Sequence, residues 1–250
     1  EPLEAGHPSA LELLARVLRV YGSCVRLRDH GTRTTVQVPR RLVGTKKETF
    51  ELHFVRPDRF RFETAEVAIG PEADWNGRRC LWNGERIGCR GRHHPGFKMD
   101  YAVGAELLAG LWLSFVVPGL LVPGAEREPS LTGATLLGLA MHDGFPCYLV
   151  RGTCSNDSQR TLWIDREHNC IRRCDDVHEF DAAWRAKMRA QTEERLRQPL
   201  SPEERAACEH VLELFSRPAE PYRTETTLLF APEFDLELPP ELFATPADWD

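Results

Sequence analysis

The sequence lacks the motifs by which the commonest enzyme classes are recognised. It has no G-x-S-x-G elbow, no H-E-x-x-H pair, no phosphate-binding lysine loop and no G-x-G-x-x-G turn. It also lacks a basic excess, because 38 Asp and Glu residues outnumber 32 Lys and Arg residues and leave a net charge of -6. Non-specific nucleic-acid binding usually requires a basic face. These absences favour a binding or interaction protein whose ligand is not a nucleic acid.

The eight cysteines are even in number but lack the spacing of a metal site. No C-x-x-C occurs, and the nearest approach is Cys170-x-x-x-Cys174. Cys89, His93 and His94 do not supply a ligand set either, because neighbouring residues on a strand point to opposite faces. The pattern predicts structural disulfides or buried thiols, with no metal and no cofactor.

No apolar run is long enough for a membrane-spanning helix. The least polar window, residues 101–122, contains Glu106, and its clean apolar part, residues 107–117, ends at Pro118. A membrane helix requires about 20 such residues, and a signal peptide would lie at the N-terminus. The window therefore predicts an apolar helix buried in the domain. The chain begins at Glu1 instead of Met, which fits removal of a leader during export.

The N-terminal part predicts one helix followed by strands. Ser9 is a typical N-cap. Four apolar residues then recur at i, i+3, i+4 and i+7, which predicts an amphipathic helix of about three turns: Leu14, Val17, Leu18 and Tyr21. The period then changes to two. Residues 23–28 and 32–38 are predicted to be strands joined by a turn at Asp29-His30-Gly31.

The next strand pair predicts one apolar floor. Phe50, Leu52 and Phe54 share one face of a strand, and Phe60 and Phe62 share one face of the next. A loop of two residues would place the two sets on opposite faces of the sheet. We therefore predict an odd loop of three or five residues around residues 56–58. These side chains form core by default, and a ligand-binding role requires that they face a cavity.

The rest of the chain predicts hairpins, a meander of strands and a pair of helices. Asn83-Gly84 predicts a hairpin over residues 80–90; it places Cys80 and Cys89 on one face at nearly opposite positions, and they are the candidate disulfide pair. Strand-like runs then predict an antiparallel meander: residues 134–141, 147–152, 161–165 and 170–177. Residues 181–197 and 202–217 predict a charged helical pair, and residues 224–238 a last extended segment.

Several segments occur in an order that is known from one family. They are the helix that ends at Tyr21, the strand pair TFELHFVRPDRFRFE, the hairpin at Trp82-Asn83-Gly84, the segment VVPGLLVPG, and the pair DGFPCYLVRG and TLWIDREHNCIRR. Over residues 20–235 this order resembles the LolA/LolB-like superfamily of periplasmic lipoprotein carriers. That superfamily also includes envelope-stress regulators of the RseB type.

The resemblance implies an α+β fold. Its centre would be a strongly curved antiparallel β-sheet, an incomplete barrel whose concave face is covered by helices. Residues 1–250 would form one domain, with residues 181–217 as an inserted helical pair. The space between sheet and helices would be an apolar cavity for acyl chains. Nine residues are expected to line it: Phe50, Leu52, Phe54, Phe60, Phe62, Leu107, Leu111, Trp112 and Phe115.

Two functions remain open at this stage. The first is a non-enzymatic binding protein of the periplasm or cell envelope that holds a lipid or a lipoprotein acyl chain. The alternative is a protein-interaction or envelope-sensing domain on the same scaffold, which would contact its partner through residues 181–217. An enzyme that uses the cysteines is a third possibility, but a nucleophilic cysteine needs a base and an orienting group, and the sequence identifies neither.

Overall fold

The computed structural model describes residues 6–38, 45–66, 79–83, 87–90, 115–121, 131–216 and 221–244 of the 250-residue chain. The helices are α1 (Ala10–Ser23), α4 (Val117–Leu120), α5 (Ala182–Leu196) and α6 (Pro202–Ser216), and a 3₁₀ turn, η1 (Pro240–Phe243), lies near the C-terminus. The first five strands are β1 (Arg26–Val38), β2 (Lys46–Val55), β3 (Arg59–Glu66), β4 (Arg79–Asn83) and β5 (Ile87–Arg90). The others are β6 (Thr132–His142), β7 (Phe145–Thr153), β8 (Gln159–Asp165), β9 (Ile171–Phe180), β10 (Tyr222–Phe230) and β11 (Glu233–Phe234).

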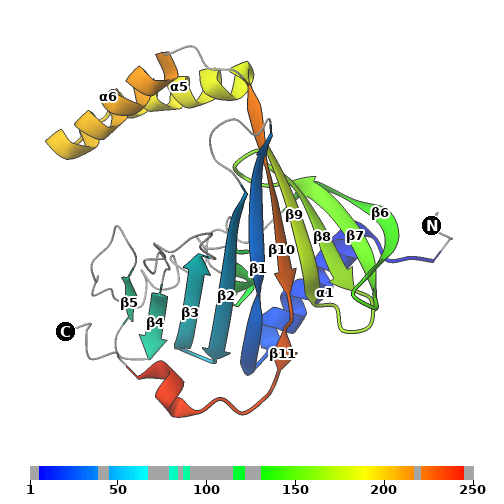
Figure 1. The fold of residues 1–250 in the computed structure, drawn as a ribbon. Coiled ribbons are helices and arrows are strands. Elements are labelled where there is room, and N and C mark those ends of the chain that lie inside the picture. Colours follow the sequence, from blue (N-terminus) through cyan, green and yellow to red (C-terminus); the bar gives the residue numbers. More distant parts are fainter. Residues whose placement is uncertain are drawn as a thin grey trace.

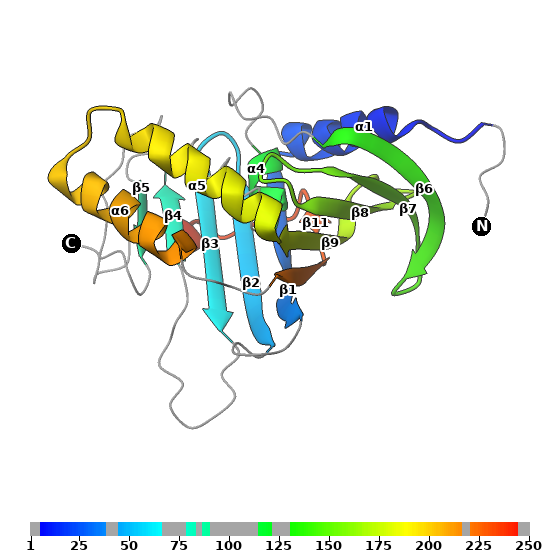
Figure 2. The same cartoon turned by 90° about the horizontal axis from the view of Figure 1, so that it is seen from above.

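One antiparallel sheet organises the molecule (Figure 1). Its strand order is β5-β4-β3-β2-β1-β10-β9-β8-β7-β6, with the short β11 also beside β1. The late strand β10 thus joins the N-terminal strands to the β6–β9 meander. No pairing among the described strands links β5 to β6, so the sheet stays open. Figure 2 shows it curving around α1 and α4, as expected for an incomplete barrel with helices on its concave face. We call this side the inner face and the opposite side the outer face.

Helix α1 begins and packs as its sequence predicts. The Ser9 hydroxyl accepts a hydrogen bond from the backbone N–H of Glu12 at 3.2 Å, and the Glu12 carboxylate accepts one from the backbone N–H of Ser9 at 2.7 Å. This capping box satisfies two N–H groups that the first turn would otherwise leave unpaired. Leu13, Val17 and Tyr21 are buried against the inner face, so the predicted amphipathic helix is confirmed.

The predicted turn at residues 29–31 is wrong, because β1 runs through it without a break. The strand is paired on both sides, with β2 on one and β10 and β11 on the other. Gly31 is required by packing and not by a turn, because a Cβ atom there would lie 1.8 Å from the carbonyl oxygen of Leu229. Asp29 is fully buried, and its Oδ1 accepts a hydrogen bond from the N–H of Ala231 at 2.9 Å.

The odd loop between β2 and β3 is confirmed. Val55 pairs with Arg59, which leaves a loop of three residues, 56–58, and Phe54 lies opposite Phe60. Arg56 in this loop is half-buried. Its guanidinium donates hydrogen bonds to the carbonyl oxygens of Cys24 at 3.0 Å and of Tyr21 and Leu121 at 3.2 Å each. One side chain therefore joins α1, the β2–β3 loop and the segment that contains α4.

The other predicted strands and the helical pair are found where they were expected, whereas most of the apolar helix predicted in residues 101–122 lies outside the described residues. Strands β6 to β9 form the meander, and α5 and α6 form the helical pair between β9 and β10. In the β4–β5 hairpin the backbone register pairs Cys80 with Cys89. Cys80 is disulfide-bonded, but the side chain of Cys89 lies outside the described residues, so this pairing stays a prediction. Among the described residues, no helix combines the length and apolar character that crossing a membrane requires.

Candidate functional site

The apolar floor lies on the inner face of β2 and β3. Phe50, Leu52 and Phe54 alternate on β2, and the register places Phe60 opposite Phe54 and Phe62 opposite Leu52. Phe50 is 5% exposed, and the other four are 1% exposed or less. The two strands therefore present one continuous apolar surface, as the odd loop length requires.

A short segment, residues 115–121, covers this floor, and we call it the cover segment. The ring of Phe115 lies 4.8 Å from the ring of Phe62 and 5.8 Å from that of Phe50, measured between centroids, in edge-to-face contacts. All seven residues of the segment are buried. The structure thus brings Phe115 onto the floor, whereas the other predicted lining residues, Leu107, Leu111 and Trp112, lie outside the described part of the chain.

The cover segment is held by a few identifiable contacts. Arg56 binds its last carbonyl, that of Leu121, and the guanidinium of Arg33 lies 5.2 Å from the centre of the Phe115 ring. Pro118 does not end the apolar segment here but lies in the first turn of the four-residue helix α4. Proline is tolerated in that turn because its missing N–H would have no helical partner.

Val116 holds a strained backbone conformation within the cover segment. Its φ is 59° and its ψ is -68°. A β-branched residue rarely adopts positive φ, and a conformation of this kind costs roughly 1–3 kcal/mol. The Val116 side chain is fully buried. Packing of the cover segment therefore stabilises a backbone conformation that valine otherwise rarely adopts.

Beyond the floor, the inner face becomes polar towards the ends of the strands that lie next to α5. The residues of this polar band are Glu48 and Lys46 on β2, Arg33 and Thr35 on β1, Thr226 and Thr224 on β10, Asp176 and His178 on β9, and Arg160 on β8. Arg160 is fully buried and binds Asp176 with two hydrogen bonds, Nε to Oδ1 at 2.7 Å and Nη2 to Oδ2 at 2.6 Å. Such two-point pairing neutralises both charges.

A hollow of about 260 Å³ lies where the polar band meets α5, and we call it the polar hollow. Eight residues line it: Asn156, Ser158, Asp176, His178, Phe180, Trp184, Thr224 and Thr226. Burial lowers the pKa of His178, although the carboxylates of Asp157 and Glu179 oppose that shift. The ring of Phe180 stacks on that of Tyr222 at 4.5 Å and meets the edge of Trp184 at 4.8 Å. Aromatic contacts therefore fix the base of the helical pair beside this hollow.

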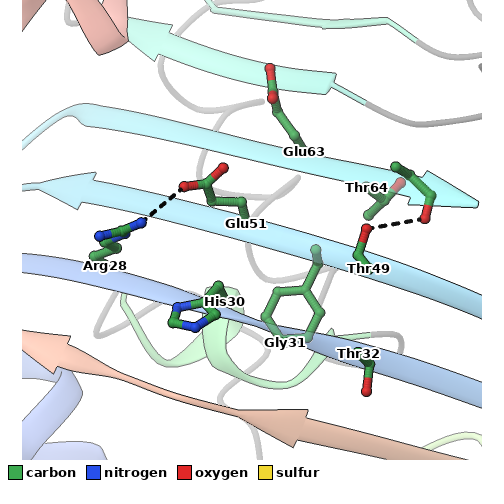
Figure 3. A pocket seen from close by; sticks show the side chains of 10 residues that line it. Arg28, His30, Gly31, Thr32, Thr49, Glu51, Glu63 and Thr64 are labelled. Carbon is green, nitrogen blue, oxygen red and sulfur yellow. Dashed lines mark hydrogen bonds and ion pairs between the residues drawn. The ribbon is translucent and has the colours of Figure 1, made fainter.

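A second hollow, of about 510 Å³, lies mainly over the outer face of β1, β2 and β3 (Figure 3). Its charged lining residues are already paired. Arg28 lies 3.8 Å from Glu51 and 3.8 Å from Glu233, and Glu63 is paired with Arg61 at 2.9 Å and with Arg79. The surface is mainly a polar strand face, and Phe50 of the apolar floor also lines it, beside Gly31.

The structure gives the ligand-type residues of β9 and the buried cysteines roles other than metal binding or catalysis. Cys174, Asp176 and His178 share the inner face, but Asp176 binds Arg160. No group of three or more metal-ligating side chains occurs among the described residues, from which His93 and His94 are missing. Burial raises the pKa of Cys147 to about 11 and that of Cys170 to about 12. These thiols are therefore protonated near neutral pH and are weak nucleophiles.

Sequence reasoning missed the polar hollow and the buried Arg160–Asp176 pair. One signal was present, because Arg160 alternates with Leu162 and Ile164, which places its side chain on the inner face of β8. Its pairing with Asp176 on β9 depends on the strand register, which cannot be read from the sequence.

No protein-family model matches this sequence, and no curated protein matches it. Similar solved structures include a LolA superfamily protein from Nitrosomonas europaea, with 11% identity, 96% of this chain and 99% of that chain covered, and a TM-score of 0.36. LprF from Mycobacterium bovis has 10% identity, 95% and 97% coverage, and a TM-score of 0.43. The Pseudomonas aeruginosa MucA/MucB complex has 10% identity and a TM-score of 0.42, with 96% of this chain but 62% of that chain covered. The solved structures to which this chain is similar thus include a member of the LolA superfamily, which its order of segments resembles.

Proposed function

We propose that this protein binds the hydrophobic chain of a lipid or a lipoprotein on the apolar floor and makes or breaks no bond. The chain would take the place of the cover segment. The observation that carries the proposal is the contact of Phe115 with Phe50 and Phe62 of the floor, in a segment whose backbone is strained at Val116. Displacing that segment releases the roughly 1–3 kcal/mol of strain and so lowers the cost of exchanging it for a ligand.

The proposal predicts how affinity depends on chain length. Burying one CH₂ group contributes about 0.8 kcal/mol, and each 1.4 kcal/mol changes the dissociation constant about tenfold. Affinity should therefore rise about fourfold for each added CH₂ until the space over the floor is full. The cost of moving the cover segment is the same for every ligand, so it shifts the whole series without changing its slope.

A displacement assay tests this. A fluorescent fatty acid is bound to the protein and competed with saturated fatty acids of increasing length. Phe50→Ala should weaken binding at least tenfold. Phe243→Ala is the matched control, because Phe243 is also buried but belongs to η1, which lies near β3 and β4 on the outer face, where Arg61 binds the Leu242 carbonyl at 3.0 Å. A flat chain-length series, or equal loss in both variants, would refute the proposal.

A second candidate function, partner binding through the helical pair, has one observation in its favour. No residue of α5 is buried, and Figure 1 shows α5 and α6 projecting away from the sheet. Short helices that bury little of their surface are marginal alone. Replacing residues 181–217 with a Gly-Ser linker should abolish partner binding and leave fatty-acid binding intact. Loss of fatty-acid binding with no loss of partner binding would count against this role.

We also propose that residues 1–250 form one domain, with α5 and α6 inserted in it, and that the protein works in the periplasm or cell envelope. The disulfide at Cys80 supports an oxidising compartment, where such bonds persist. Strands β9 and β10 pair directly on either side of the insertion, which supports one folding unit. Cell fractionation tests the location, and a single thermal unfolding transition tests the proposal of one domain.

A further inference from the structure

The inner face changes from apolar to polar at the same level on neighbouring strands. On β10, Leu228 and Phe230 lie among the buried core residues, whereas Thr224 and Thr226 line the polar hollow. The register carries this boundary across β10, β9 and β8, because Thr226 pairs with Asp176 and Asp176 pairs with Arg160. The inner face therefore has an apolar end and a polar end, just as an amphiphile has a hydrocarbon chain and a polar head group.

The distance between the apolar end and the polar end of the inner face is comparable to the length of a small amphiphile. Thr224 and Leu228 are four residues apart on one face of β10, which at about 3.4 Å per residue corresponds to roughly 14 Å along the strand. A ligand whose hydrocarbon chain lies on the apolar floor would therefore bring its head group to the level of the polar hollow. The hollow, at about 260 Å³, has the volume of roughly nine water molecules at about 30 Å³ each.

The lining of the polar hollow disfavours a charged head group. Its carboxylate, Asp176, is already neutralised by the buried Arg160, so the hollow has no strong preference for a cation. No lysine or arginine is among the lining residues that the structure describes, and these residues therefore offer no positive charge to an anion such as a phosphate. The remaining polar lining consists of hydroxyls, one amide and one imidazole.

The hydrogen-bonding groups of the polar hollow suit hydroxyls instead. The Thr224 hydroxyl can donate and accept, and the Ser158 hydroxyl, which donates to Asn156 Oδ1 at 2.7 Å, can still accept. Nε2 of His178 is buried and has no hydrogen-bond partner among the described residues, and a buried polar atom left unpaired costs free energy. Phe180 and Trp184 add apolar ring surface beside these groups. A ring with hydroxyls around its edge and C–H groups on its faces complements such a lining.

We propose that the polar hollow binds an uncharged head group that bears several hydroxyls, such as a sugar, of an amphiphile whose chain lies on the apolar floor. This inference rests on the proposed function and specifies its ligand class. The strands then orient the ligand, with the chain beneath the cover segment and the head beside α5. The helical pair is fixed at the base of the same hollow through Phe180 and Trp184, so it lies next to the bound head group.

Four amphiphiles with one decyl chain test the head group directly. Decyl glucoside, decyl phosphocholine, decyl sulfate and decyltrimethylammonium compete with the fluorescent fatty acid below their critical micelle concentrations. Decyl glucoside should bind at least tenfold more tightly than the three charged compounds. Thr224→Val and His178→Phe should reduce that preference to less than threefold while leaving the affinity for decyl sulfate unchanged. Thr227→Val, whose hydroxyl bonds Asp175 at 2.9 Å on the outer face, is the matched control and should keep the preference.

The outcomes separate the two proposals. If the four compounds bind equally and fatty acids still show the chain-length series, the head-group inference is overturned and the proposed function stands. A preference for a charged head group, or a glucoside preference that survives both hollow variants, also overturns the inference. If no amphiphile binds and no chain-length series is seen, the proposed function itself fails.

Discussion

Replacing Asp29 with asparagine should change how the stability of this protein depends on pH. Asp29 is fully buried on β1, its Oδ1 accepts the N–H of Ala231, and its Oδ2 has no hydrogen-bond partner among the described residues. Burial raises the pKa of this carboxyl well above its usual value, although hydrogen bonds from Ala231 and His30 and the charge of Arg172 oppose the shift. The folded protein therefore holds this group neutral where the unfolded chain ionises it.

The sign and size of the effect follow from proton linkage. Because the folded pKa is raised, the unfolded chain loses its proton first, and stability falls as pH rises from the unfolded value of about 3.9 towards the folded pKa. Each pH unit in that window costs about 1.4 kcal/mol. Asparagine keeps an acceptor for the Ala231 N–H and cannot ionise. Its buried NH₂ group costs about 1–3 kcal/mol, but that cost is independent of pH.

Urea denaturation of both proteins at pH 5, 6 and 7 measures the difference. The stability of Asp29→Asn relative to the wild type should increase with pH, by at most about 1.4 kcal/mol per pH unit while the pH stays below the folded pKa, and each kcal/mol corresponds to about 2–4 °C in Tm. Asp143→Asn, at a side chain that is 79% exposed, controls for the loss of one carboxylate. A difference between Asp29→Asn and wild type that does not change with pH would refute the argument that Asp29 is neutral in the fold.

Three further predictions concern covalent structure and packing. The unfolded, unreduced chain should titrate six free thiols and the reduced chain eight; eight without reduction would contradict the disulfide at Cys80. Arg56→Lys should destabilise the fold by about 1–3 kcal/mol in urea denaturation, because lysine cannot bind three carbonyls in the geometry of a guanidinium. Phe62→Ala, at a side chain with 0% exposure, should cost about 3–5 kcal/mol, while Leu11→Ala, at 69% exposure, should stay within about 0.5 kcal/mol; equal effects would mean that the floor is not core.

Local patterns allowed several elements to be predicted from the sequence. The Ser9 capping box, the alternation of Phe50, Leu52 and Phe54, and the resulting odd loop depend on residues close together in the chain. The meander and the helical pair are likewise local, since each strand returns beside the one before it. Such features follow from backbone periodicity and short-range hydrogen bonds, which a single sequence displays directly.

The predicted turn at Asp29-His30-Gly31 was wrong for a reason that lies elsewhere in the chain. Glycine and aspartate are typical of turns, but here Gly31 admits the carbonyl of Leu229 and Asp29 binds the N–H of Ala231. Both contacts come from β10 and the residue after it, about 200 residues away. The strand forms despite the local preference for a turn, because pairing on both edges of β1 satisfies more backbone hydrogen bonds than a turn would.

The order of the strands, the helical pair and the single face that carries the five floor residues can all be predicted from local sequence patterns. Only the tertiary structure decided that β10 enters between β1 and β9, that Phe115 covers the floor, and that Asp176 meets Arg160 beside the polar hollow. The physical reason is that periodicity determines which face of an element a side chain occupies. Which elements come together across long stretches of chain depends on how the whole molecule buries its apolar surface and pairs its polar groups.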